Sequence, residues 1–304
     1  MLFGSTAFAE DPLSVPLQTP PPQGPSQSPP LQKSDISISQ EATVSASATG
    51  GAHTSFGGNG FHTVSEQEDF FHYVVSPEVT PTFLPRIGVE WQRYSFGLPD
   101  THVPLPNTLQ SVSAVLGFDY SIGDHWLIRL EAQPGIYGDF YSTGSQNFNV
   151  PVILGGSYLV NENLQMVLGV SIDPWRKIPV LPGAGVRWQF DPKWCLDFIL
   201  PQPRLEYEVT KDLHTYIGAE IQTGTYRVGP TFGNQFGQPG MNGAIIEYTE
   251  GRAGGGLSWK FTPGFNLEAE GGMMLERSFD YSRAGDRVGS DPAPYCQIAF
   301  KASY

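Results

Sequence analysis

Long apolar runs are missing from this chain: no segment approaches the roughly 18 consecutive apolar residues of a transmembrane helix. Charged side chains are also scarce, at 15% of the 304 residues, whereas about a quarter is usual in soluble proteins. Lys and Arg number 17 against 30 Asp and Glu, a net charge of −13, so no basic surface is available to bind phosphates. The sequence therefore argues against a helical membrane protein and against nucleic-acid binding, but it leaves short membrane-spanning strands open.

Cysteine is rare as well. Only Cys195 and Cys296 occur, far apart in the sequence, which is neither a disulfide framework nor a zinc-binding spacing. The strand pattern described below puts Cys195 on the inner face and Cys296 on the outer face, so we expect no disulfide between them. His53, His62 and His72 also lack the spacing of metal ligands. We therefore expect no metal and no cofactor.

Glycine, proline and aromatic residues are abundant instead, with 35 Gly, 27 Pro and 12% aromatics. Gly and Pro are poor helix formers, so we expect an all-β fold. Residues 1–9 end in Ala7-Phe8-Ala9, the form of a signal-peptidase site, and are predicted to be the remnant of a signal peptide. Residues 10–69 are rich in Pro, Gln, Ser and Gly without a regular period, which predicts a disordered segment. The folded domain is expected over residues 70–304, with residues 70–79 adding a strand or a pair, or covering one end.

Alternation of apolar and polar residues is the main signal in the folded domain. From Phe265 to Leu275 the odd positions are apolar or glycine, while Glu268, Glu270 and Glu276 occupy even positions, so a strand here has one apolar and one acidic face. Short turns such as 161–163 and 262–264 alternate with long polar connections such as 228–243. This rhythm is typical of an outer-membrane barrel with short periplasmic turns and long external loops. We expect about twelve strands, with ten to fourteen compatible, near residues 81–96, 108–120, 126–138, 148–160, 164–172, 179–190, 194–200, 203–209, 213–226, 244–261, 265–281 and 295–304.

Aromatic residues indicate which face points outward. They gather on the apolar face beside the short turns, as expected where a lipid-facing surface meets the headgroups. A soluble β-protein, with its apolar faces buried against each other, remains an alternative. The predicted membrane-interface girdle consists of Tyr120, Trp126, Phe190, Trp194, Phe261, Phe265 and Tyr304.

Two segments resemble known bacterial outer-membrane proteins. The C-terminal strand, residues 295–304 with Ile298, Phe300 and Tyr304, resembles the signal that barrel-assembly machinery recognises. The stretch Trp188–Tyr207, with its Asp-Pro-Lys turn and Leu-Pro-Gln-Pro, is similar to an uncharacterised, porin-like family of Gram-negative outer-membrane barrels, and the resemblance spans roughly residues 84–304. It implies a single closed antiparallel transmembrane β-barrel in the outer membrane, with the N-terminal segment in the periplasm. It implies no activity and no site.

The polar strand faces predict a charged lumen. The turn registers place Arg187 opposite Asp197, Glu208 opposite His214, and Arg252 near Glu270 and Glu276, within reach of cross-strand interaction. The residues expected to line the lumen are Arg86, Glu90, Arg129, Glu131, Arg187, Asp197, Arg204, Glu206, Glu208, Glu220, Arg252, Glu268, Glu270 and Glu276.

The first functional hypothesis is a narrow passive diffusion channel for small polar solutes or ions. The alternative is a closed structural barrel that anchors the envelope, since twelve strands fall between barrels filled by side chains and barrels with an aqueous channel. An outer-membrane hydrolase is the third reading, but Asp100 and His102 on one polar loop are not a catalytic constellation. We expect no enzyme, and as partners only outer-membrane lipid, the barrel-assembly machinery and small solutes or ions.

Overall fold

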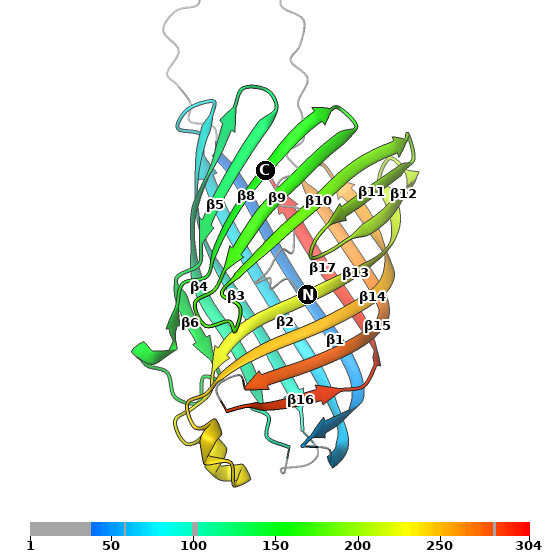
Figure 1. Ribbon diagram of the computed structural model, residues 1–304. Coiled ribbons are helices and arrows are strands. Elements are labelled where there is room, and N and C mark those ends of the chain that lie inside the picture. Colours follow the sequence, from blue (N-terminus) through cyan, green and yellow to red (C-terminus); the bar gives the residue numbers. More distant parts are fainter. Residues whose placement is uncertain (1–37, 58, 99–102, 282–283) are drawn as a thin grey trace, which may run out of the picture.

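The computed structural model describes residues 38–57, 59–98, 103–281 and 284–304. Within them the chain forms a closed antiparallel barrel of fourteen strands, with three further short strands at one end (Figure 1). β1 pairs with β2 on one side and with β17 on the other, which closes the ring. The barrel strands are β1 (Ile38–Phe56), β2 (Asn59–Pro77), β3 (Phe83–Gly97), β4 (Thr108–Ile122), β5 (Trp126–Ala132), β8 (Val152–Asn161), β9 (Leu164–Ile172), β10 (Val180–Asp191), β11 (Trp194–Ile199), β12 (Arg204–Thr210), β13 (Leu213–Arg227), β14 (Ile245–Thr262), β15 (Phe265–Tyr281) and β17 (Ala293–Ser303).

The barrel has two strands more than the twelve expected, and they are β1 and β2. The prediction that residues 38–69 belong to a disordered segment is wrong, and residues 70–77 are the second half of β2. In β1 the outward positions are largely alanine and the inward ones Ser, Thr or Glu. A segment with so little apolar surface still forms a strand when it hydrogen-bonds to a strand on each side. The predicted signal-peptide remnant, residues 1–9, and the Pro-rich residues up to 37 lie outside the described residues.

The short turns lie together at one end of the barrel. In the hairpin β10–β11, Asp191 pairs with Trp194 across a two-residue turn and a bulge follows, so that Arg187 still faces Asp197. The hairpin β14–β15 has the same shift beside Gly264, whose φ of +81° lies in the left-handed region that favours glycine. The predicted register therefore survives in β10–β11 although the turn itself is one residue shorter.

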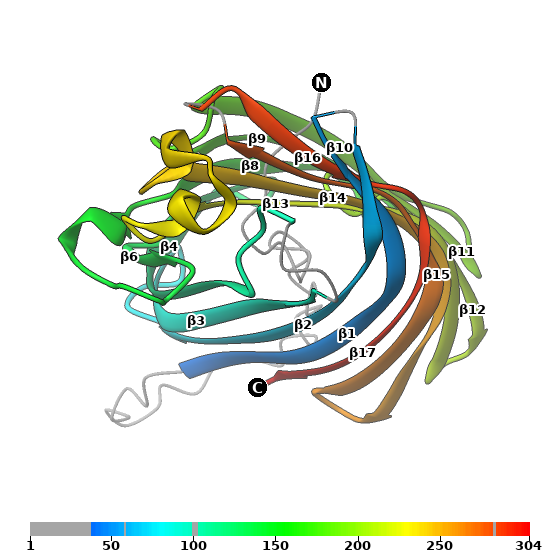
Figure 2. The same cartoon turned by 90° about the horizontal axis from the view of Figure 1, so that it is seen from below.

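Strand length differs sharply around the barrel. β1 to β4 and β13 to β15 have 15 to 19 residues, whereas β5 and β8 to β12 have only 6 to 12. Where the short strands end, β6 (Gly135–Gly138) pairs with β4 and, through Gly138, with Arg227 of β13. On the other side β16 (Asp286–Ser290) joins β15 to β1. The ring is therefore smaller at the long-loop end, where it runs β1-β2-β3-β4-β6-β13-β14-β15-β16 (Figure 2).

The long-loop end also carries the remaining elements. The connection from β5 to β8 contains β6, η1 (Ser145–Asn147) and β7 (Phe148–Asn149). The connection from β13 to β14 contains the 3-10 helices η2 (Phe232–Phe236) and η3 (Pro239–Met241), which stand beside the barrel mouth in Figure 2. No helix of the described residues is long and apolar enough to cross a membrane.

The outer surface is apolar over the short-turn half of the barrel. Large hydrophobic side chains such as Val89, Leu168 and Leu257 are exposed there, and a cross-strand pair of opposite charges, Asp69 and Arg93, lies on the outer face nearer the long loops. Water would oppose the exposure of so continuous a belt, whereas lipid does not. The predicted girdle residues Tyr120, Trp126, Phe190, Trp194, Phe261 and Tyr304 are exposed at the short-turn end, and Phe265 contacts Phe261 and Tyr304 there.

Candidate functional site

The interior of the barrel opens at the short-turn end. A cavity of about 830 Å³ lies among the turns and the inner faces of β4 to β13, and we call it the vestibule. The rim is formed by turn residues of three hairpins, among them Gly123, Asn163 and Lys193. Deeper in, its wall includes Ser157, Gln165, Arg187, Gln189, Cys195, Glu206, Glu208 and His214. The vestibule wall therefore mixes charged and hydrogen-bonding groups with apolar side chains such as Leu127 and Leu159, and the cavity is wide enough to hold many water molecules.

The charges of the vestibule wall are only partly neutralised. The Arg187 guanidinium donates to Asp197 at 3.1 Å, as the sequence register predicts. His214 and Glu208 are direct cross-strand neighbours, also as predicted. No ion pair to Glu206 or Glu208 occurs within the described part of the chain. Glu206 and Glu208 therefore line the vestibule without an ion-pair partner among the described residues.

A first network of charges covers the inner wall of β1 to β5. Arg86 donates to Glu41 at 3.0 Å and to Glu131 at 3.4 Å. Arg129 holds both oxygens of Asp119 at 2.6 and 2.7 Å, the bidentate geometry that makes arginine–carboxylate pairs strong. All of these groups are buried except Glu41, which is partly exposed, so the pairs fix the wall and leave little unpaired charge on it.

A second network crosses the lumen. Arg252 of β14 donates to Glu250 on its own strand and to Glu68 of β2 at 3.1 Å. Arg277 of β15 lies 2.6 Å from Glu250 and 3.1 Å from Glu66. Both arginine side chains are fully buried, and burying such charges is tolerated only when partners surround them. The network ties β2 to β14 and β15 across the interior.

A small cavity of about 40 Å³ lies between the second network and the vestibule side of the lumen. The side chains around it are almost all hydrogen-bonding, and Arg204 stacks on the Tyr216 ring at 4.4 Å. This volume accommodates a few water molecules but no larger solute. Its lining includes Glu68, Phe70, Gln92, Gln202, Arg204, Glu220, Ile221, Gln222, Glu268, Gln297 and Lys301.

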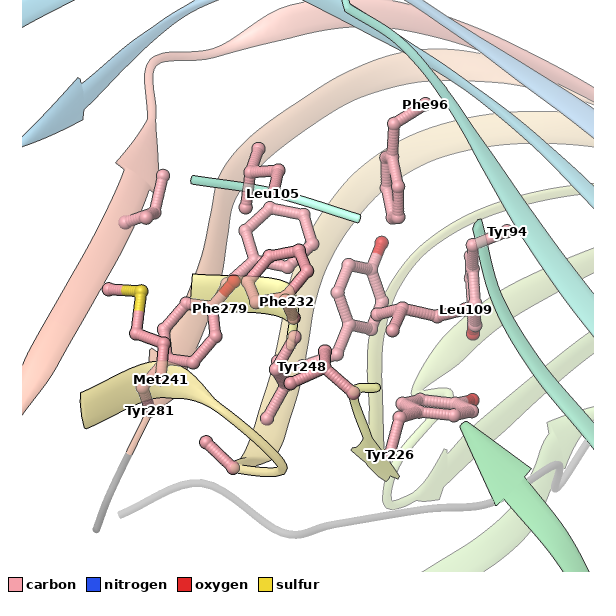
Figure 3. Close-up of a cluster of buried hydrophobic side chains, with 14 of the residues drawn as sticks. Tyr94, Phe96, Leu105, Leu109, Tyr226, Phe232, Met241, Tyr248, Phe279 and Tyr281 are labelled. Carbon is pink, nitrogen blue, oxygen red and sulfur yellow. The ribbon is translucent and has the colours of Figure 1, made fainter. Parts of the chain in front are cut away.

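Aromatic side chains fill the lumen at the long-loop end (Figure 3). Tyr94 of β3 meets Tyr248 of β14 with ring centroids 4.6 Å apart, and Phe96 meets Phe279 at 5.1 Å. These rings come from opposite sides of the smaller ring of strands, and small barrels are filled by side chains in this way. We call Tyr94, Phe96, Tyr226, Tyr248, Phe279 and Tyr281 the aromatic seal.

The β3–β4 connection completes the seal. Val103 and Leu105 are buried in the same cluster, and the Tyr281 hydroxyl donates to the Pro104 carbonyl at 2.6 Å. Asp139, in the connection after β6, accepts a hydrogen bond from the backbone N–H of Gly229 at 2.7 Å. This bond holds the connection from β13 to β14 against the connection that follows β6. Burial raises the pKa of the Asp139 carboxyl above its usual range, although backbone N–H donors oppose the shift. The axial path is therefore closed at this end.

The structure places the predicted lumen residues on the inner face with one exception. Glu276 is exposed and pairs with Arg287 at 2.7 Å, so its prediction as a lumen residue is wrong. A register shift between Gly251 and Arg252 in the β14–β15 pairing moves Glu276 away. Arg252 lies opposite Met274, and its side chain contacts Glu250 and Glu68 rather than Glu270 and Glu276.

Sequence reasoning missed several interior groups. Glu66 and Glu68 fall in the segment taken as disordered, although their spacing of two is that of one strand face. Glu250 and Arg277 were missed too, and with the aromatic seal they occupy the centre of the interior. For the aromatic seal, the sequence did contain a signal: Tyr and Phe occupy alternate positions of β3 on its inward face.

Metal and catalytic sites can be considered on the same geometry. No group of three or more His, Cys, Asp or Glu able to hold a metal occurs among the described residues. Cys195 and Cys296 are both free, and Cys296 is exposed on the outer face. Asp100 and His102, considered above for hydrolysis, lie outside the described residues.

The closed ring of strands, the apolar outer belt and the polar interior define an outer-membrane-type β-barrel protein. The chain belongs to the family described as "Domain of unknown function (DUF6268)", whose profile matches residues 100–287. The assignment to an uncharacterised family of barrel proteins, suggested by the sequence, is thereby confirmed. No curated protein sequence matches the chain.

Three solved structures are similar to the chain in fold. The COG4313 outer membrane channel from Pseudomonas putida F1 is 10% identical, with 90% of this chain and 100% of that chain covered and a TM-score of 0.47. The TodX deltaS2S3 mutant, a monoaromatic hydrocarbon channel, is 8% identical, with 88% and 91% covered and a TM-score of 0.47. The KdgM porin in complex with disordered oligogalacturonate is 10% identical, with 86% and 99% covered and a TM-score of 0.35.

Proposed function

We propose that this protein is a narrow, passive, porin-like channel of the bacterial outer membrane for small polar solutes or ions. The observation that carries the proposal is the vestibule of about 830 Å³, which opens at the short-turn end and leads toward a second polar cavity in mid-barrel. An anchor needs no such water-filled interior. In this proposal the short turns and the N-terminal segment face the periplasm, as short turns do in barrels of this kind.

The interior charges favour cations over anions. Carboxylates outnumber cationic groups on the inner face, and rings of acidic side chains select cations in channels. The inner carboxylates are Glu41, Glu66, Glu68, Glu90, Asp119, Glu131, Asp197, Glu206, Glu208, Glu220, Glu250, Glu268 and Glu270, and the inner cations are Arg86, Arg129, Arg187, Arg204, Arg252, Arg277 and Lys301.

The proposal includes roles for the last strand and the girdle. Ile298 and Phe300 point outward on β17, and Tyr304 packs against Phe265 with ring centroids 4.9 Å apart. β17 closes the barrel between β1 and β15, so its placement completes assembly. We assign recognition by the barrel-assembly machinery to this strand and the anchoring of the barrel in lipid to the girdle.

Conductance in a planar bilayer tests the proposal. The decisive variant is Tyr94→Ala/Tyr248→Ala, which removes two facing rings of the aromatic seal. The matched control is Tyr120→Ala/Tyr207→Ala, which removes two tyrosines from the outer surface near the short turns. Because the aromatic seal closes the axial path in the structure, we expect only rare, brief current steps from the wild type and the control. The seal variant should give frequent and larger steps, with a reversal potential of cation-selective sign in a salt gradient.

Silence from both the wild type and the seal variant, with heat-modifiable β-structure retained, would contradict the channel. It would leave the closed structural barrel as the function. A reversal potential of anion-selective sign would contradict only the charge argument.

A further inference from the structure

One side of the vestibule wall carries charges of both signs. Arg187 of β10, Glu206 and Glu208 of β12 and His214 of β13 all line the cavity of about 830 Å³. Only β11 stands between β10 and β12 in the sheet, and β12 pairs directly with β13. These charged and titratable groups therefore face the same water-filled volume from neighbouring strands.

Two carboxylates of this wall are held at a fixed spacing. Glu206 and Glu208 are two residues apart on one strand face, so their Cα atoms lie about 6.6 Å apart at a rise of about 3.3 Å per residue. Neither forms an ion pair within the part of the chain that the structure describes. Cys195 and Tyr216 lie opposite Glu206, and His214 lies opposite Glu208. Because a cleft lined by charge of one sign concentrates the opposite charge, this pair suits a ligand with two cationic groups on one stem.

Arg187 supplies the opposite charge on the same wall. Its guanidinium donates to Asp197 at 3.1 Å, and 35% of the Arg187 side chain is exposed to the vestibule. Five N–H donors in a planar fork let one guanidinium serve more than one carboxylate. Two strand spacings of about 4.8 Å separate β10 from β12, a gap that the long Arg187 side chain shortens.

Cys195 lies where the two signs of charge meet. It pairs with Gln189 of β10 on one side and with Glu206 of β12 on the other, and its thiol is within electrostatic reach of both Arg187 and Glu206. The side chain of cysteine is small and only weakly polar. It therefore leaves room for a ligand group that carries a carboxylate and an ammonium on the same carbon.

The geometry points to a binding site for basic α-amino acids, such as lysine and ornithine, in the vestibule. At neutral pH such a ligand carries one carboxylate and two ammonium groups. Arg187 binds the α-carboxylate, Glu206 the α-ammonium group and Glu208 the terminal ammonium group, with the methylene stem along β12. The ligand is cationic overall, in agreement with the excess of carboxylates on the inner face.

The inference deepens the proposed function and rests on it only for passage beyond the vestibule. The mid-barrel cavity of about 40 Å³ holds a few water molecules, and the aromatic seal closes the axial path beyond it. An amino acid that enters from the short-turn end is therefore retained in the vestibule until the path opens.

Isothermal titration calorimetry of the refolded protein with lysine tests the site. Norleucine keeps the α-carboxylate, the α-ammonium group and an apolar stem but lacks the terminal ammonium group. Cadaverine keeps both ammonium groups but lacks the carboxylate, so it tests Arg187 while Asp197 stays paired. We expect saturable binding of lysine and about ten-fold weaker binding of each analogue, because hydrogen bonds between charged groups are the strong ones.

The decisive variant is Glu206→Gln/Glu208→Gln, which preserves the shape of the wall and removes both charges. The matched control is Asp124→Asn/Glu162→Gln, which removes two carboxylates from the rim of the same vestibule. The net charge of the protein changes equally in the two variants. We expect about ten-fold weaker lysine binding in the wall variant and unchanged binding in the rim variant.

Equal lysine affinity in the wall and rim variants would overturn the site, and so would norleucine or cadaverine binding as tightly as lysine. A wild type without saturable lysine binding would overturn it as well. Heat-modifiable mobility checks that each variant folds. The titration needs no current: lysine binding by a protein that is silent in the bilayer would contradict the channel and support the site, whereas currents without lysine binding would overturn the site alone.

Discussion

Replacing Arg252 by methionine should destabilise the barrel more than any change at a surface charge. The Arg252 side chain is fully buried and lies 3.1 Å from Glu68, 3.5 Å from Glu66 and within hydrogen-bond distance of Glu250. It also donates to Gln297 at 3.3 Å and lies over the Tyr295 ring. Methionine fills much of the volume but supplies no charge, so three buried carboxylates are left with Arg277 alone.

The magnitude follows from that arrangement. One ion pair at 3.1 Å is worth about 5 kcal/mol at an effective dielectric constant near 20, and the carboxylates keep the desolvation cost of burial after the cation is gone. Protonation of a carboxylate or entry of water recovers part of this loss. Removal of one partner from a buried pair accordingly costs about 3–5 kcal/mol. We expect that range for Arg252→Met.

Arg287→Met is the matched control. Arg287 also pairs with a glutamate, at 2.7 Å, but the two side chains are 58% and 65% exposed, and exposed pairs contribute about 0–1 kcal/mol. Urea unfolding of protein folded into liposomes, followed by tryptophan fluorescence, measures both free energies of unfolding. A loss for Arg252→Met no larger than the loss for Arg287→Met would refute the reasoning that the buried network holds β2 to β14.

Two further predictions concern backbone space and pH. Gly185→Ala should cost about 1–3 kcal/mol, because its Cβ would come within 2.6 Å of the Ile199 Cα. A Cβ at Gly183 would meet no heavy atom closer than 3.9 Å, so Gly183→Ala should leave the unfolding midpoint unchanged or slightly raised; equal losses in the two variants would contradict this difference. Asp139→Asn should flatten the pH dependence of the thermal midpoint. The pKa of Asp139 in the folded protein lies above its usual value of 3.8. At pH values between the unfolded-state pKa and the folded-state pKa, the folded protein therefore binds more protons than the unfolded chain. The contribution of Asp139 to the free energy of unfolding falls as pH rises through that window. Thermal scans of both proteins across that window check this, and parallel curves would contradict it.

The alternation of side chains was sufficient to predict the barrel, the outward apolar face and most strands from β3 onward. It also predicted Arg187 opposite Asp197, because a short turn fixes the register of its own hairpin. It failed in β1, where alanine replaces larger apolar residues, and at Glu276, where a bulge shifts the pairing. Bulges of this kind leave little trace in one sequence.

The narrowing of the ring could not be predicted from local pattern. It depends on Gly138 meeting Arg227, a contact between residues far apart in the chain. The aromatic seal follows from that narrowing, because the rings of Tyr94 and Tyr248 meet only when opposite walls approach.

The central claim is that the interior opens at the short-turn end and is closed at the long-loop end. Cys195 lines the vestibule, so its reaction with a charged, membrane-impermeant maleimide reports the direction of access in a Cys296→Ser background. We predict no labelling in intact cells, rapid labelling once the periplasm is opened, and labelling of intact cells only in the Tyr94→Ala/Tyr248→Ala variant. Equally rapid labelling of Cys195 in intact cells with the seal present would contradict the account.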